Sequence, residues 1–284
     1  MVSHLQNKSL EQKKNFKSAM SEVPMLCIIL YVLMQFINIS ASSIYGPDSS
    51  TCSEYIKIIQ DPGLAMIPLN NIQYDINKRP IYDSYEISDA PFNSTSKFAV
   101  GIVCAHNYFR NIAGIPFLKW NNELGEFAYN YTIKNPCKPW AKIGVEDRTD
   151  KFGFSLIGSL VTKTRRNILK YNISRYATDQ IAKWYYNIKH YQYSSKHYKG
   201  CPTRGDYRLI GYFTQVMWAS TTDVGCAIKS CENLYDTQAT FVCFYGPSGN
   251  IEGSNVFDSA AHQKLNASEY KKEFKGLPSC DLEN

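Results

Sequence analysis

The sequence predicts an α+β fold in which helices cover a small antiparallel sheet and disulfide bonds hold the chain. Three observations support this: apolar residues recur at helical spacing from residue 98 onward, alternating β-rich segments follow later, and cysteines are numerous. Helices come first and strands last, which is the order of an α+β domain. The 284 residues, 44% of them hydrophobic, are enough to bury a sizeable core.

The N-terminus has the pattern of a secretory signal peptide. Residues 1–22 are polar, residues 23–37 form an apolar run, and the small residues "SASS" follow. A retained signal anchor is the alternative, but the run is shorter than the roughly 20 residues that span a membrane. We therefore expect residues 1–42 to be the signal peptide, with the mature chain starting near Ser42 or Ser43 and no transmembrane segment after cleavage. Met20 or Met25 could be the true start.

Residues 43–96 form an irregular N-terminal extension. The segment is rich in Ser, Pro, Asn, Asp and Tyr and has no sustained periodicity. We expect it to be fixed at Cys52, with one short helix near "CSEYIKIIQ".

Three helices are predicted in the domain at 97–253. The first carries apolar residues at steps of three and four between Phe98 and Ile112. The second starts at "NNELGEF", with Asn121 or Asn122 as its cap, and ends before Pro136. The third begins at Thr178.

The strands follow from shorter patterns. Residues 152–161, "FGFSLIGSLV", are typical of a strand, and residues 223–231 and 238–246 alternate around a turn-prone "ENLYDT", which predicts an antiparallel hairpin. The C-terminal extension at 254–284 is polar, with a short helix expected around "ASEYKKEF" and a covalent tie at Cys280.

The cysteines indicate an oxidising compartment. One of the nine lies in the apolar run, which leaves eight, and none of them forms a CxxC pair of the kind that binds metals. We therefore expect disulfides and no free thiol. Four sequons, at Asn93, Asn130, Asn172 and Asn266, agree with a secreted, glycosylated protein.

Charge and motifs exclude several functions. A net charge of +6 is too mild to indicate nucleic-acid binding. Neither Ser155 nor Ser248 lies in a G-x-S-x-G motif, and no cysteine has a papain-like context, so nucleophilic catalysis has no support.

Four stretches resemble the CAP superfamily, which includes cysteine-rich secretory proteins, insect antigen 5, plant pathogenesis-related proteins and the venom-allergen-like proteins of parasitic worms. They are "HNYFR" at 106–110, "GYFTQVMW" at 211–218, "VGC" at 224–226 and "FVCFYGPSGNI" at 241–251, in the family's order. The resemblance implies a three-layer α-β-α sandwich. It also implies a secreted protein that acts by binding, here at a host–parasite interface, without enzymatic activity. Proteolysis, proposed for isolated family members, is the rival activity.

The resemblance also implies disulfide pairs. These join Cys137 to Cys231 and Cys226 to Cys243. The remaining Cys52, Cys104, Cys201 and Cys280 allow three connectivities. Many relatives carry an extra cysteine between the third helix and "FTQ", whereas this chain has only Cys201 there. We therefore expect an unusual bond to an extension.

Relatives commonly place two histidines and two glutamates around a cleft that can hold a divalent metal. The corresponding positions here are Ala141, Phe154, Asn187 and Tyr212. None of these is a good ligand for a borderline cation such as zinc, so we expect no metal and no cofactor. Tyr212 is expected to fill space, with its hydroxyl hydrogen-bonded.

Two motif residues could instead form an anion site. His106 and Arg110 lie on one side of the first predicted helix, but the resemblance favours a structural role for both. The turn-rich segment from Gly246 to Asn250 is also interpreted as structural.

The segment at 183–201 interleaves tyrosines with lysines and histidines. Tyr191, Tyr193 and Tyr198 could present aromatic faces to a lipid, a glycan or a protein partner. The alternative is a solvated loop with half-buried tyrosines. We therefore expect a protein receptor or host factor as partner, with a sterol or fatty acid as the second possibility.

Overall fold

The computed structural model describes residues 50–61, 73–74, 80–81, 90–135, 147–163, 172–191, 193, 207–230 and 239–267. The predicted signal peptide, most of the predicted tail helix, and Cys137, Cys201, Cys231 and Cys280 lie outside these ranges. None of the helices within them is long and apolar enough to cross a membrane.

A four-stranded sheet forms the centre of the domain. Its strand order is β3 (Lys119–Trp120), β7 (Asp223–Ser230), β8 (Ala239–Gly246) and β6 (Gly158–Lys163). Strand β8 pairs antiparallel with both β7 and β6, which confirms the predicted hairpin. The short edge strand β3 instead runs parallel to β7.

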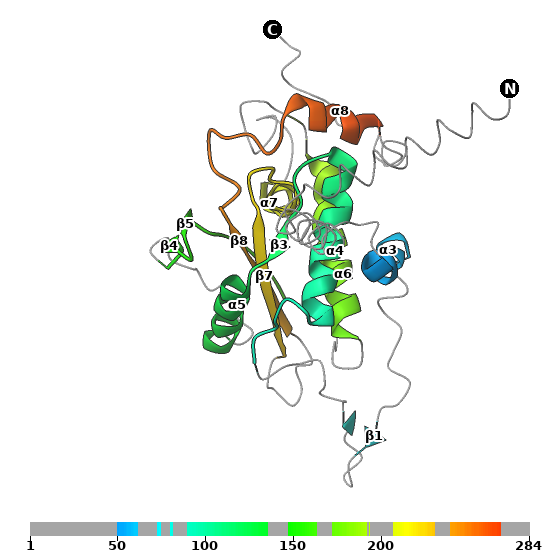
Figure 1. Ribbon diagram of the computed structural model, residues 1–284, viewed down its shortest axis with the longest axis vertical. Coiled ribbons are helices and arrows are strands. Elements are labelled where there is room, and N and C mark those ends of the chain that lie inside the picture. Colours follow the sequence, from blue (N-terminus) through cyan, green and yellow to red (C-terminus); the bar gives the residue numbers. More distant parts are fainter. Residues whose placement is uncertain are drawn as a thin grey trace, which may run out of the picture. The chain divides into compact units, whose positions relative to one another are not determined.

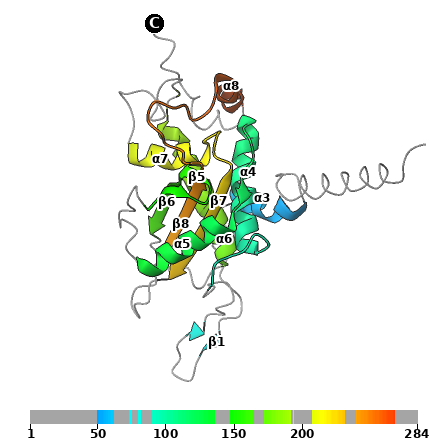
Figure 2. The same ribbon diagram turned by 60° about the vertical axis from the view of Figure 1, so that its left-hand side comes forward.

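Helices cover both faces of this sheet. They are α4 (Lys97–Ala113), α5 (Asn122–Lys134), α6 (Ile173–Tyr185), η5 (Tyr186–His190) and α7 (Tyr207–Val216). Helix α8 (Ser259–Ala267) packs on α4. Figure 1 shows α5 on one side of the sheet and the paired α4 and α6 on the other, and Figure 2 shows the same arrangement from a turned view. This is the predicted α-β-α sandwich.

Alternating side chains of β8 separate two hydrophobic cores. Phe241, Cys243 and Tyr245 belong to the large core under α4, α6 and α7. Val242 and Phe244 belong to the smaller core under α5. Because successive residues of a strand point to opposite faces, one fully buried strand contributes to both layers.

Polar side chains define where the helices begin. Ser96 caps α4 by accepting from the Ala99 amide, and Asn121, one of the two predicted caps, accepts from Leu124 at the start of α5. The third helix begins at Ile173 rather than at Thr178, because Asn172 caps it.

Further elements differ from the prediction. The expected strand at 152–161 is divided between β6 and β5 (Phe154–Leu156), and β5 pairs with β4 (Thr149–Lys151). Residues Gln73–Tyr74 (β1) and Pro80–Ile81 (β2) form a small separate ladder. Helix α7 was not predicted, and α8 precedes most of the segment expected to be helical at the C-terminus.

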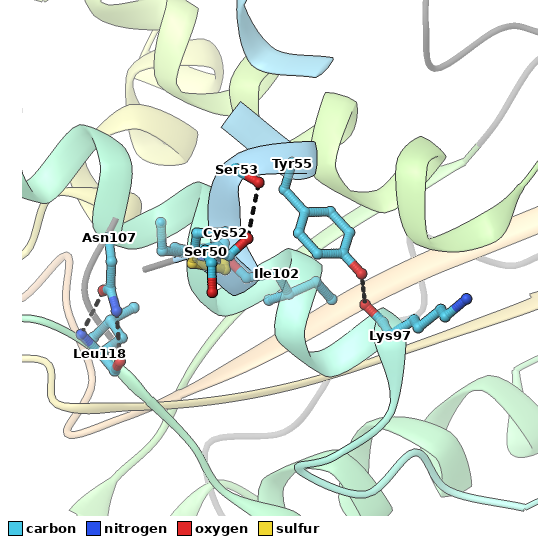
Figure 3. Close-up of a disulfide and its surroundings, with 10 residues drawn as sticks. Ser50, Cys52, Ser53, Tyr55, Lys97, Ile102, Asn107 and Leu118 are labelled. Atoms are coloured by element: carbon cyan, nitrogen blue, oxygen red, sulfur yellow. Dashed lines mark hydrogen bonds between the residues drawn. A yellow bond between two sulfur atoms is a disulfide. The ribbon is translucent and has the colours of Figure 1, made fainter. Parts of the chain in front are cut away.

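The N-terminal extension contributes a helix to the domain surface. After the short turn η1 (Ser50–Cys52), α3 (Ser53–Gln60) confirms the helix expected near "CSEYIKIIQ". Cys52 forms a disulfide with Cys104 of α4, and the Tyr55 hydroxyl donates to the Lys97 carbonyl at 3.0 Å (Figure 3). The extension is therefore fixed at Cys52, as expected. The unusual bond expected from the single Cys201 stays a prediction, because that residue lies outside the described ranges.

A glycine permits this docking. A methyl group on Gly101 of α4 would lie 2.7 Å from the Tyr55 ring and 2.9 Å from the Thr178 hydroxyl of α6. Helix α3 thus packs closely on α4 and α6 because position 101 has no side chain. The second disulfide, Cys226–Cys243, joins the facing strands β7 and β8 and is the pair that the resemblance implied.

We predict that Gly101→Ala destabilises the protein although alanine is the better helix former. The collision with Tyr55 should outweigh the roughly 1 kcal/mol gain in helix propensity, for a net loss of about 1–2 kcal/mol in urea unfolding. Gly211→Ala in α7 is the matched control, because its methyl group would meet Asn250 at an ordinary 3.7 Å and should stabilise. Equal stabilisation by both substitutions would contradict this packing.

Candidate functional site

The motif residues of α4 point into the core. Arg110 is fully buried, and its guanidinium donates to five backbone carbonyls, at distances from 2.6 to 3.4 Å: Pro116, Val216, Trp218, Ala219 and Thr221. Burial lowers the pKa of this guanidinium to about 9, so it remains charged at neutral pH. All five of its N–H donors have acceptors, which leaves none to bind an anion.

His106 is the second buried motif residue. Its Nδ1 lies 2.8 Å from the Ile102 carbonyl, which can only accept, so Nδ1 carries the proton. Its Nε2, 3.0 Å from the Tyr245 hydroxyl, therefore accepts from that group. Burial lowers the pKa of His106 to about 3 and raises the pKa of Tyr245 well above its usual value. Both groups are neutral at physiological pH and join α4 to β8.

Thr214 and Gln215, the polar residues of "GYFTQ", connect α7 to the chain after β8 by hydrogen bonds. Thr214 donates to the Asn250 side chain at 2.6 Å, and Asn250 donates back to the Gly211 carbonyl at 2.9 Å. Gln215 accepts from the Gly249 amide at 3.1 Å. The turn-rich exit from β8 is therefore structural.

Tyr212 lies half-buried beside α6. Its ring stacks on Trp184, with centroids 5.6 Å apart and planes 18° apart, and its hydroxyl donates to the Val161 carbonyl of β6 at 3.0 Å. Trp184 stacks in turn on Phe241 of β8. The tyrosine thus fills space between helix and sheet with its hydroxyl hydrogen-bonded.

The other cleft positions are not all placed beside it. Asn187, in η5, donates its amide to the carbonyls of Lys183 and Trp184, so it shares a neighbour with Tyr212. Phe154 belongs to the smaller core, where its ring covers Gly246 on the α5 face of the sheet. Phe154 and Tyr212 thus pack against different cores, and Ala141 lies outside the described residues, so convergence of the four positions is not confirmed.

The residues present do not fit the divalent metal that the resemblance implies. Phe154 has no ligand atom, and Asn187 and Tyr212 offer neutral oxygens, while zinc prefers thiolate, imidazole and carboxylate. In the described part of the chain, no group of three or more His, Cys, Asp or Glu side chains is placed to hold a metal.

The tyrosines proposed to meet a lipid or partner belong to the core. Tyr191 is 2% exposed and Tyr193 is 5% exposed. Tyr191 packs against Phe213, and Tyr193 stacks on His262 of α8 with ring centroids 4.1 Å apart. The prediction that these two residues offer aromatic faces to a ligand is wrong, because tertiary packing covers them. Tyr198 lies outside the described residues.

Sequence reasoning missed two partners of the site. Tyr245, the partner of His106, was seen only as part of a strand, although a polar residue at a buried strand position was a usable signal. Asp179 is buried in α6 and forms an ion pair with Lys183, and the i,i+4 spacing of these opposite charges could have indicated it.

This geometry defines a disulfide-bonded α-β-α domain whose motif residues hold its layers together. Residues 103–245 match the family model described as "Cysteine-rich secretory protein family", or CAP. The match covers half of the chain, and the protein belongs to this family.

Similar proteins come from animals, fungi and plants. Mouse glioma pathogenesis-related protein 1 is 30% identical over 173 residues, 59% of each chain. Salivary antigen-5 of Dipetalogaster maximus is 25% identical over 57% of this chain and 66% of its own. The matches thus cover less than two thirds of either relative.

The solved structures matched at low similarity include a venom-allergen-like protein. Schistosoma mansoni venom allergen-like protein 4 is 20% identical, with a TM-score of 0.40, over 55% of this chain and 91% of that one.

The buried histidine predicts a specific acid sensitivity. Its pKa is about 3 in the folded protein and near 6.5 when unfolded, so between these values the unfolded chain binds the extra proton. Stability should therefore fall as the pH drops from 6.5 toward 3, by up to about 1.4 kcal/mol per pH unit from this group. In urea unfolding at pH 4.5 and 6.5, His106→Gln should show a smaller pH dependence than wild type. If His106→Gln loses as much stability between pH 6.5 and pH 4.5 as wild type does, the assignment is wrong.

Proposed function

We propose that this protein is a secreted, non-enzymatic CAP-domain protein that acts by binding a protein partner at a host–parasite interface. The main support is that the motif side chains able to do chemistry are already committed to internal hydrogen bonds.

A general acid or base must titrate near the working pH and reach its substrate. His106 does neither, because it is fully buried and its pKa is about 3. Arg110 uses its donors on carbonyls, and Tyr212 uses its hydroxyl on Val161. The family motifs here therefore stabilise the fold. Binding of a partner is then a role of the exposed residues.

Extracellular action is supported by the covalent structure and by the relatives. Two buried disulfides, Cys52–Cys104 and Cys226–Cys243, are typical of proteins from oxidising compartments. Two relatives are named after saliva or venom, salivary antigen-5 of Dipetalogaster maximus and venom allergen 5 of Vespa magnifica. By analogy with these two relatives, we infer that the present chain acts outside the cell that makes it, on a host.

A sterol or fatty-acid carrier is the alternative, and it is now less favoured. It relied on exposed tyrosines between residues 183 and 199, two of which are buried in the core. Removing Tyr191 and Tyr193 would disrupt packing around Phe213 and Phe257, so their loss would not report on lipid binding.

Full-length protein secreted from a eukaryotic host tests this proposal. Native mass spectrometry should show no retained sterol or fatty acid. Elemental analysis after a chelator rinse should show far less than one zinc per chain. Casein should stay uncleaved by wild type and by Tyr212→Phe alike, and labelled protein should bind host cells saturably, in competition with unlabelled protein.

Three results would overturn parts of the proposal. A stoichiometric lipid would establish the carrier. Casein cleavage that Tyr212→Phe abolishes would establish an enzyme. Absence of saturable binding to host cells would remove the host partner.

A further inference from the structure

Two of the four sequons lie beside the same helix. Asn93 is exposed in the loop before α4, and Asn130 is exposed on α5. Each is followed two residues later by a threonine, so both have the acceptor pattern for an N-linked glycan.

Asn93 has a local geometry suited to modification. Its side-chain oxygen accepts from the Thr95 amide at 3.1 Å and from the Thr95 hydroxyl at 2.9 Å. Both bonds use the oxygen, and neither uses the amide nitrogen that receives the sugar. Because this turn involves only neighbouring residues, it can form before the domain folds.

Asn130 reaches solvent although its sequon partner does not. Thr132 is fully buried and donates to the Tyr129 carbonyl, whereas Asn130 is exposed. A glycan attached to the nascent chain would therefore remain outside the core when α5 forms.

The two asparagines flank one surface. The Ser94 amide donates to the Asn122 side chain at 3.1 Å, which fixes the first sequon at the start of α5. Exposed residues Asn122, Glu126 and Asn130 follow at intervals of four along that helix. From Asn122 to Asn130 the helix rises about 12 Å, so large sugars at both sequons would cover most of its outer face.

Asn172 is placed differently. It is half-buried at the start of α6, where its side-chain oxygen caps the helix by accepting from the Arg175 amide at 2.9 Å. Arg175 also pairs with Glu54 of α3, so a glycan here would adjoin the contact between α3 and α6. The side chain of Asn266 lies outside the described residues.

We propose that Asn93 and Asn130 both carry N-linked glycans and that Asn172 does not, so that the outer face of α5 presents carbohydrate to any partner. This rests on the proposed extracellular role. In the reaction, a lipid-linked oligosaccharide diphosphate is the donor. A bond forms between the asparagine Nδ2 and the sugar C1, the bond from C1 to the phosphate oxygen breaks, and the lipid diphosphate leaves. The proton lost from Nδ2 passes to a base of the transferase.

Site-specific mass spectrometry of the full chain tests this. The chain is expressed with its own N-terminus in an insect-cell host. Medium and cells are both treated in ¹⁸O water with a peptide N-glycanase that accepts insect glycans; it hydrolyses the side-chain amide, releases the glycan as its glycosylamine and marks each modified asparagine as labelled aspartate. Thr95→Ala and Asn130→Gln should each remove one glycan. Ser94→Ala, which keeps the first sequon, and Glu126→Gln, on the same face of α5, should remove none.

Label at Asn93 and Asn130, lost in the matching variants and absent from Asn172, supports the proposal. Secreted protein that lacks label at Asn93, at Asn130 or at both, or that carries label at Asn172, overturns the glycan assignment. These results leave the proposed function intact. Chain retained in the cytosol without any label overturns both.

Discussion

The fold depends on one buried cation. Arg110 places a guanidinium in the core, and no carboxylate of the described residues forms an ion pair with it. The hydration that it loses is replaced by carbonyls of the loop after α4, the end of α7 and the approach to β7. Hydrogen bonds to charged groups are roughly twice as strong as neutral ones, and five planar donors also fix direction. Segments more than a hundred residues apart in sequence are thereby held in one arrangement around the C-terminal end of α4.

The neighbouring polar groups extend this arrangement. His106 and Tyr245 connect α4 to β8, and Thr214 with Asn250 connects α7 to the exit from β8. Each group is neutral, and three of the four are fully or almost fully buried. A buried polar network of this kind stabilises one packing when its members are paired, and by the same pairing it withholds them from a substrate. Tyr212 is committed in the same way at the edge of the sheet, because its hydroxyl donates to the Val161 carbonyl.

Much of this could be predicted from the sequence, because helical periodicity, caps and the β-rich hairpin are local signals. That Phe154, Asn187 and Tyr212 lack a good zinc ligand is visible in the sequence, but whether these positions share one cleft depends on tertiary packing. Tertiary packing was not readable: the interleaved tyrosines and lysines after α6 suggested a surface, but Phe213 and Phe257 cover Tyr191 and Tyr193. Helix α7 was missed because its aromatic residues were interpreted as a motif rather than as a helix face. The Cys52–Cys104 pairing stayed open because spacing cannot choose among three connectivities.

The central claim is that Arg110 acts as a structural anchor, and urea unfolding of two variants measures it most directly. Arg110→Lys retains a charge but reaches fewer carbonyls, and Arg110→Met leaves them all unpaired. The account predicts losses of at least about 2 kcal/mol for the lysine variant and more for the methionine variant, up to failure to fold. Arg175→Lys, at the exposed ion pair with Glu54, should cost less than about 1 kcal/mol. If Arg110→Lys proves no more destabilising than Arg175→Lys, the anchor assignment is wrong.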